Sequence, residues 1–70
     1  MNAKEIANAI NTHVKKTQDS VESAGYTHNG HPIVAVYINT RYAASYGLVV
    51  RQKYLGNTTY NFRPDDEVDP

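Results

Sequence analysis

The spacing of apolar residues changes once along this chain, at Gly25, and this change limits the fold more than any other feature. Before Gly25, Ile6, Ile10 and Val14 recur every fourth residue, which is the spacing of one helix face. After Gly25 come short runs rich in β-branched residues and tyrosine, separated by residues that favour turns. The sequence therefore predicts one helix followed by strands, which is an α+β fold.

The expected helix covers residues 3–24. Asn2 is a favourable N-cap, and Glu5, three residues later, completes an asparagine version of the capping box. Gly25 can adopt the left-handed conformation that ends many helices. The apolar stripe of this helix consists of Ile6, Ile10, Val14, Thr17 and Val21.

Three strands are expected after a linker that contains an Asn-Gly turn, at residues 33–40, 48–54 and 58–63. A turn at 43–45 and a three-residue loop at 55–57 bring the apolar residues of all three strands to one face, which burial favours. We therefore expect an α-β-β-β domain over residues 1–64, with the helix packed on a three-stranded antiparallel meander. The inner face would carry Val34, Val36, Ile38, Leu48, Val50, Tyr54, Tyr60 and Phe62.

The charges of the chain are unevenly distributed along the sequence. No acidic residue lies between Glu22 and Asp65, so this stretch is formally +4 in a chain whose net charge is 0. The balancing acids include a tail at 65–70, which we expect to be mobile. The strand pattern places the basic residues on the outer face of the sheet. The expected partner-binding residues there are Tyr37, Asn39, Arg41, Arg51, Lys53, Asn61 and Arg63.

This outer face has two interpretations. It can be the ordinary solvated face of an antiparallel sheet. Alternatively, its cations and tyrosine can bind an anionic partner, either the phosphates of a nucleic acid or an acidic protein surface. The lack of acids favours binding, because a face that serves only solubility mixes both signs of charge.

The first expected strand is apolar on both faces, and it would form an edge of the meander. One explanation is that Ile33 and Ala35 pack under the preceding linker. The other is a homodimer whose interface includes Ile33, Ala35 and Tyr37. A second copy is plausible because a chain this short buries only about 60% of its unfolded surface.

The absence of cysteine excludes disulfides and thiolate metal sites, and it fits a cytoplasmic protein. No signal-peptide pattern and no membrane-length apolar run occur, so we expect a soluble protein without a membrane partner. His28 and His31 are two residues apart, but a zinc site needs further ligands, so no metal and no cofactor are expected. No nucleophile elbow or phosphate-binding glycine loop is present, and we expect no enzyme activity.

The leading functional hypothesis is a small non-catalytic protein-binding module, a homodimer in the cytoplasm. By size and composition it resembles accessory proteins of phages and mobile elements, and an inhibitor of a host nucleic-acid-handling or defence machine fits that class. The alternative is direct nucleic-acid binding through the same sheet face. The net charge of 0 and the pI of about 6.8 count against it, because dedicated nucleic-acid binders are usually basic. A purely structural subunit is the third hypothesis.

Overall fold

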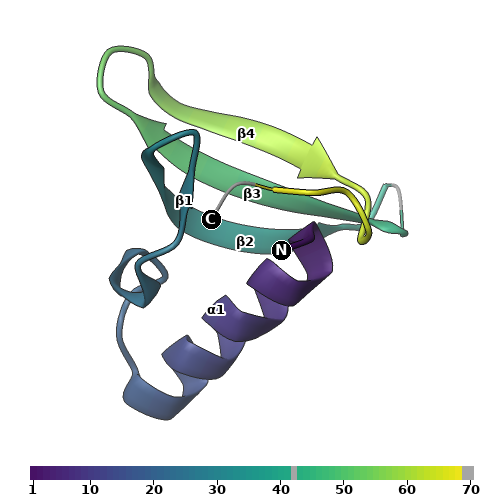
Figure 1. Cartoon of the computed structure of the whole chain (residues 1–70), viewed down its shortest axis with the longest axis horizontal. Helices are drawn as coiled ribbons and strands as arrows, with labels where there is room; N and C mark the ends of the chain where they lie inside the picture. The colour runs from purple at the N-terminus through teal and green to yellow at the C-terminus, as the bar shows by residue number, and fades with distance from the viewer. Residues whose placement is uncertain (42, 69–70) are drawn as a thin grey trace.

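The computed structural model describes residues 1–41 and 43–68. Within them, four strands form one antiparallel sheet in the order β1-β2-β3-β4, and α1 lies along one side of it (Figure 1). The expected α+β fold with an N-terminal helix is confirmed, but the sheet has one strand more than predicted. The elements are α1 (Ala3–Thr17), the 3-10 helix η1 (Glu22–Ala24), β1 (Thr27–His28), β2 (His31–Asn39), β3 (Ser45–Gln52) and β4 (Gly56–Phe62).

The start of α1 is the capping box that the sequence predicts. The Glu5 N–H donates to Asn2 Oδ1 over 2.9 Å, and the Asn2 N–H donates back to Glu5 Oε1 over 3.4 Å. Both orphan N–H groups are thereby satisfied, which fixes the first helical residue at Ala3.

The helix ends at Thr17, so the prediction that it continues to residue 24 is wrong. Residues 17–20 are Thr, Gln, Asp and Ser, and the side chains of Thr17, Asp19 and Ser20 can compete with helical hydrogen bonding. The Thr17 hydroxyl donates to the His13 carbonyl over 2.7 Å and accepts from the Asp19 N–H over 3.3 Å. Gly25, with a φ of 80°, ends the short helix η1 that follows, and not α1.

The segment expected to be a linker contains a hairpin. Asn29 and Gly30 have φ values of 51° and 79°, the positive values that a two-residue hairpin turn requires at both central positions. On either side, Thr27 pairs with Pro32 and His28 with His31. The Asn-Gly signal was correctly assigned to a turn, but a strand of two residues has no periodicity that could reveal it.

The β3–β4 loop consists of residues 53–55, because Gln52 pairs with Gly56. The expected loop was two residues further along the chain, and a shift of two residues leaves the side chains of the paired β3 and β4 residues on their predicted faces. Leu48 and Val50 are therefore fully buried, as expected. Tyr54 is not: it lies in the loop, 86% exposed, instead of on the inner face.

A β-bulge in β2 overturns one face assignment. The pairing of β2 with β3 shifts between Ile33 and Ala35, so Ile33 pairs with Val50 while Ala35 pairs with Val49. The extra residue turns Ile33 into the core, where it is fully buried, and replaces Val34 at that position of the inner face. The sequence could not resolve this choice because both residues are apolar and β-branched.

The core lies between α1 and the inner face of the sheet. The apolar stripe of α1 supplies Ile6 and Ile10, both fully buried, whereas Thr17 is exposed. The residues that make up the core are Ala3, Ile6, Ile10, Ile33, Leu48, Val50 and Val68.

Residues 65–68 fold back onto the first turn of α1, so the folded unit extends past the boundary that we expected at Pro64. The Ala3 N–H donates to the Asp66 carbonyl and the Lys4 N–H to the Pro64 carbonyl, each over 3.0 Å. Val68 enters the core with 2% of its surface exposed. The tail thus satisfies two orphan helix N–H groups and places carboxylates near the positive end of the helix dipole. Asp69 and Pro70 lie outside the described residues.

Candidate functional site

The face of the sheet that points away from α1 is the candidate binding surface, and we call it the outer face. The core, the docked tail and the His28 ring, which packs on Tyr60 and Phe62, all lie on the opposite face. The pairing of β2, β3 and β4 defines the members of the outer face. They are Ala35, Tyr37, Asn39, Ser45, Gly47, Val49, Arg51, Asn57, Thr59 and Asn61.

Tyr37 lies flat in the middle of the outer face. Its cross-strand neighbour is Gly47, and a Cβ atom placed on Gly47 would collide with the tyrosine ring. The ring therefore occupies the space that a side chain at position 47 would fill. Because Tyr37 is still 42% exposed, part of its aromatic ring is accessible to a partner.

Two asparagines beside Tyr37 are also held in place. Asn39 Nδ2 donates to Asn61 Oδ1 over 3.1 Å, which links β2 to β4 across β3. Asn39 Oδ1 accepts a hydrogen bond from the Arg41 N–H over 3.0 Å, so both the nitrogen and the oxygen of the Asn39 side-chain amide are hydrogen-bonded. The bridge is possible because the β3 residues beneath it, Ser45 and Gly47, are small.

The basic residues do not form one patch. Arg41 follows β2 and Arg63 follows β4, which places both at one end of the sheet. Arg51, near the end of the eight-residue β3, and Lys53, just after it, lie at the other end. The length of β3 is roughly 25 Å at the usual rise per residue. The neutral middle of the outer face separates the two pairs.

Arg51 is also paired with an acid that is distant in sequence. Its Nη1 lies 2.9 Å from Glu22 Oε1, in an ion pair whose side chains are 56% and 40% exposed. An exposed pair of this kind contributes little to stability, about 0–1 kcal/mol. It does lower the positive potential at that end of the sheet, so the run of basic residues in the sequence overstates the basic character of the surface.

The tip of the β3–β4 hairpin exposes two large apolar side chains. Tyr54 is 86% exposed and Leu55 is 77% exposed. The ammonium of Lys53 lies 5.5 Å from the centre of the Tyr54 ring, within the range of a cation–π contact. The sequence pattern missed this feature, although Gly56, with a φ of 69°, is the residue that ends such a loop.

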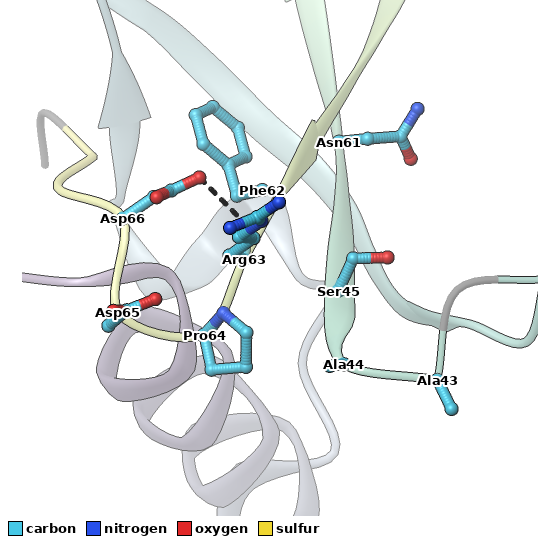
Figure 2. Close-up of a pocket in the computed structure, with 9 residues that line it drawn as sticks. All are labelled: Ala43, Ala44, Ser45, Asn61, Phe62, Arg63, Pro64, Asp65 and Asp66. Atoms are coloured by element: carbon cyan, nitrogen blue, oxygen red, sulfur yellow. Dashed lines mark hydrogen bonds between the residues drawn. The ribbon is translucent and has the colours of Figure 1, made fainter.

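A depression of about 820 Å³ lies where β3 and β4 meet the docked tail. Figure 2 shows Ser45 and Asn61 on one side of β4, with Phe62 and Asp66 on the other. The Arg63 N–H donates to Asp66 Oδ2 over 2.9 Å. With one arginine and two aspartates the lining is formally −1, and its polar groups do not converge, so it suits neither phosphate binding nor catalysis. The lining residues are Ala43, Ala44, Ser45, Asn61, Phe62, Arg63, Pro64, Asp65 and Asp66.

The histidines have local contacts. His13 Nε2 lies 3.3 Å from Asp19 Oδ2, and the His28 ring centre is 4.7 Å from that of Tyr60. Among residues 1–41 and 43–68, no three His, Cys, Asp or Glu side chains come together in a way that could hold a metal ion.

Of the three residues expected at a dimer interface, two lie on the outer face and one lies in the core. Ile33 is in the core, Ala35 is half-buried on the outer face, and Tyr37 covers Gly47. Ile33 therefore cannot contribute to a surface, whereas a dimer contact through Ala35 and Tyr37 stays a prediction.

Comparison with protein-family models, with curated proteins and with solved structures found no match for this chain. In the described part of the chain, no helix combines the length and the apolar character needed to cross a membrane.

Proposed function

We propose that this chain is a small, non-catalytic protein-binding module that uses the middle of its outer face. The observation that carries the proposal is Tyr37, an aromatic ring that packs over Gly47 and is still 42% exposed. Aromatic side chains that lose little conformational entropy are favoured in protein interfaces. The Asn39–Asn61 pair beside the ring adds hydrogen-bonding groups whose geometry is already set.

The distribution of charge supports a protein ligand over a nucleic acid. A sheet that binds nucleic acid combines stacking aromatics with a continuous basic groove. Here the cations lie at opposite ends of the sheet, and Arg51 is paired with Glu22. Direct nucleic-acid binding remains the alternative, with Arg51 and Lys53 at one end of the sheet and Arg41 and Arg63 at the other as its cations.

A narrower hypothesis is that the module is an accessory protein of a phage or mobile element that acts in the cytoplasm as an inhibitor of a host machine. It rests on chain length, composition and the absence of cysteine, and it stays a prediction.

Replacing Tyr37 by Ser should abolish partner binding without unfolding the domain, because the ring lies on the outer face and not in the core. The measurement is affinity capture with the immobilised protein, comparing the proteins retained by wild type and by Tyr37→Ser. Loss of an interface aromatic typically costs about 2 kcal/mol or more, a drop of roughly thirtyfold in affinity.

Thr12→Ser is the matched control, because Thr12 is exposed on α1, away from the sheet. The proposal predicts a protein retained by wild type and by Thr12→Ser but lost with Tyr37→Ser. Equal retention by all three, with thermal melting unchanged, would contradict a binding site at Tyr37.

A further inference from the structure

The turn of the β1–β2 hairpin contains Asn29 followed by Gly30. Each of the other asparagines in the chain is followed by alanine, threonine or phenylalanine. Asparagine is a chemically labile residue, because the backbone nitrogen of the next residue can attack its side-chain amide carbon. A glycine at the next position has no Cβ to hinder this approach. The hairpin turn therefore combines the two residues that react most readily in this way.

The structure leaves both reacting groups accessible. Asn29 and Gly30 are exposed. In the described part of the chain, nothing beyond the immediate neighbours of Gly30 lies within 4 Å of the place where a Cβ on this residue would stand. The Asn29 side-chain nitrogen lies 3.4 Å from His28 Nε2, which is long for a hydrogen bond. The Asn29 amide is therefore held weakly and can rotate toward the Gly30 nitrogen.

Other asparagines are held more firmly. The side chains of Asn2, Asn39 and Asn61 take part in hydrogen bonds of 3.1 Å or less. Asn8 and Asn11 lie within α1, where the backbone nitrogen that follows each of them is engaged in helical hydrogen bonding. The contrast sets Asn29 apart by its environment as well as by its neighbour in sequence.

The hairpin that must open for the reaction is short. Ring closure needs the turn backbone to rotate away from its φ values of 51° and 79°. The turn is closed by the pairing of His28 with His31. The next backbone hydrogen bond along the hairpin runs from the Ile33 N–H to the Tyr26 carbonyl, over 3.0 Å. Two-stranded hairpins of this size are marginally stable, so local opening costs little free energy.

We propose that the β1–β2 hairpin is a site of spontaneous deamidation at Asn29. The Gly30 nitrogen forms a bond to Asn29 Cγ, and the bond between Cγ and Nδ2 breaks. The proton of the Gly30 N–H leaves with the amide nitrogen as ammonia, and a cyclic succinimide remains. Water then adds to one of the two ring carbonyls, which gives either aspartate or isoaspartate. The reaction needs no partner, so its test is independent of the proposed function.

The two products affect the hairpin differently. Each adds one negative charge, which moves the net charge of the chain from 0 to −1. Aspartate keeps the backbone unchanged and tolerates the left-handed conformation of the turn. Isoaspartate adds a carbon to the backbone, so the two-residue turn can no longer close. The His28 ring, whose centre is 4.7 Å from that of Tyr60 and 5.4 Å from that of Phe62, then loses its place over β4.

Incubation of the folded protein at neutral to mildly alkaline pH tests the site. Ion-exchange chromatography should show a more acidic species that grows with time, and peptide mapping by mass spectrometry should place the change at Asn29. The Asn29→Asp variant has no amide at this position, so growth of this species should be lost. Asn57→Asp is the matched control, because Asn57 is exposed on β4 and is followed by the β-branched Thr58. This control keeps Asn29 and should convert at the wild-type rate.

An unstructured peptide of residues 26–33 supplies the reference rate. The folded protein should convert more slowly than this peptide, because the turn must first open. The proposal is overturned if wild type forms no acidic species in the time that the peptide converts completely. It is also overturned if Asn29→Asp converts as fast as wild type, or if the map places the change at another asparagine.

Melting of the separated products tests the effect on the hairpin. The isoaspartate form, identified by its labelling with an isoaspartyl methyltransferase, should melt at a lower temperature than the Asn29→Asp variant. Both carry the same added charge, so the difference reports the altered backbone alone. Equal melting temperatures would contradict the loss of the His28 ring from its place over β4.

Discussion

Val50→Asp is expected to abolish the cooperative folding of this domain. Val50 is fully buried between α1 and the sheet, and an aspartate there would have no partner for its charge. Burying such a charge, or unfolding locally to avoid it, costs several kcal/mol. The whole stability of a chain of this size is roughly 4–10 kcal/mol. Circular dichroism during heating should show no cooperative transition.

The matched control is Val49→Asp, the same substitution one residue earlier on the opposite face. Val49 belongs to the outer face, where an aspartate can remain hydrated, so this variant should keep a cooperative transition. If Val50→Asp melts cooperatively while Val49→Asp does not, the two faces of the sheet have been assigned the wrong way round.

Val68→Asp is expected to destabilise the domain by about 2–4 kcal/mol while leaving its unfolding cooperative. The side chain is 2% exposed, and burial of a valine contributes about 1.5–3 kcal/mol. The hydrogen bonds that the tail makes to Ala3 and Lys4 would also be lost. In this variant the tail can detach from the core, and the aspartate is then hydrated. The loss of stability is therefore limited to the free energy with which the tail docks on α1.

Urea denaturation of Val68→Asp measures this loss as a lower midpoint. Glu67→Gln is the control, because the Glu67 side chain is 82% exposed and its replacement should change the midpoint little. A Val68→Asp midpoint equal to that of wild type would mean that the tail does not dock on α1.

The elements that periodicity controls were predictable. The start of α1 follows from Asn2 and Glu5, and burial alone places Leu48 and Val50 on the inner face. The β2–β3 and β3–β4 turns lie earlier in the chain than predicted. The shifts are even, so the paired residues next to these turns keep the faces that we predicted for them. Loop position was therefore less important than the requirement that apolar residues share a face.

The bulge at Ile33 and the docking of Val68 could not be predicted in this way. In the run Ile-Val-Ala-Val every residue is apolar, so nothing in the pattern selects which one enters the core. Val68 is a single apolar residue among acids, and only the geometry of the first turn of α1 shows that it has a place to bind. Both features depend on contacts between distant parts of the chain.

The candidate site shows the same limit. The prediction of an outer face with Tyr37, Asn39 and Asn61 agrees with the strand register. The outer face is less basic than the sequence predicts, because Glu22 forms an ion pair with Arg51 and the other cations lie at the ends of the sheet. The order of charges along the sequence does not show which charges lie together on the surface, because this depends on the fold.

We propose that the outer face binds a protein and does not bind the phosphates of a nucleic acid. The most direct test is fluorescence anisotropy with labelled duplex DNA and duplex RNA, at low and at moderate salt. We expect no saturable binding at low salt, because the described cations lie at opposite ends of the sheet and form no continuous surface that could displace counterions from the phosphates. Saturable binding that weakens steeply with salt would contradict it and would favour a nucleic-acid ligand.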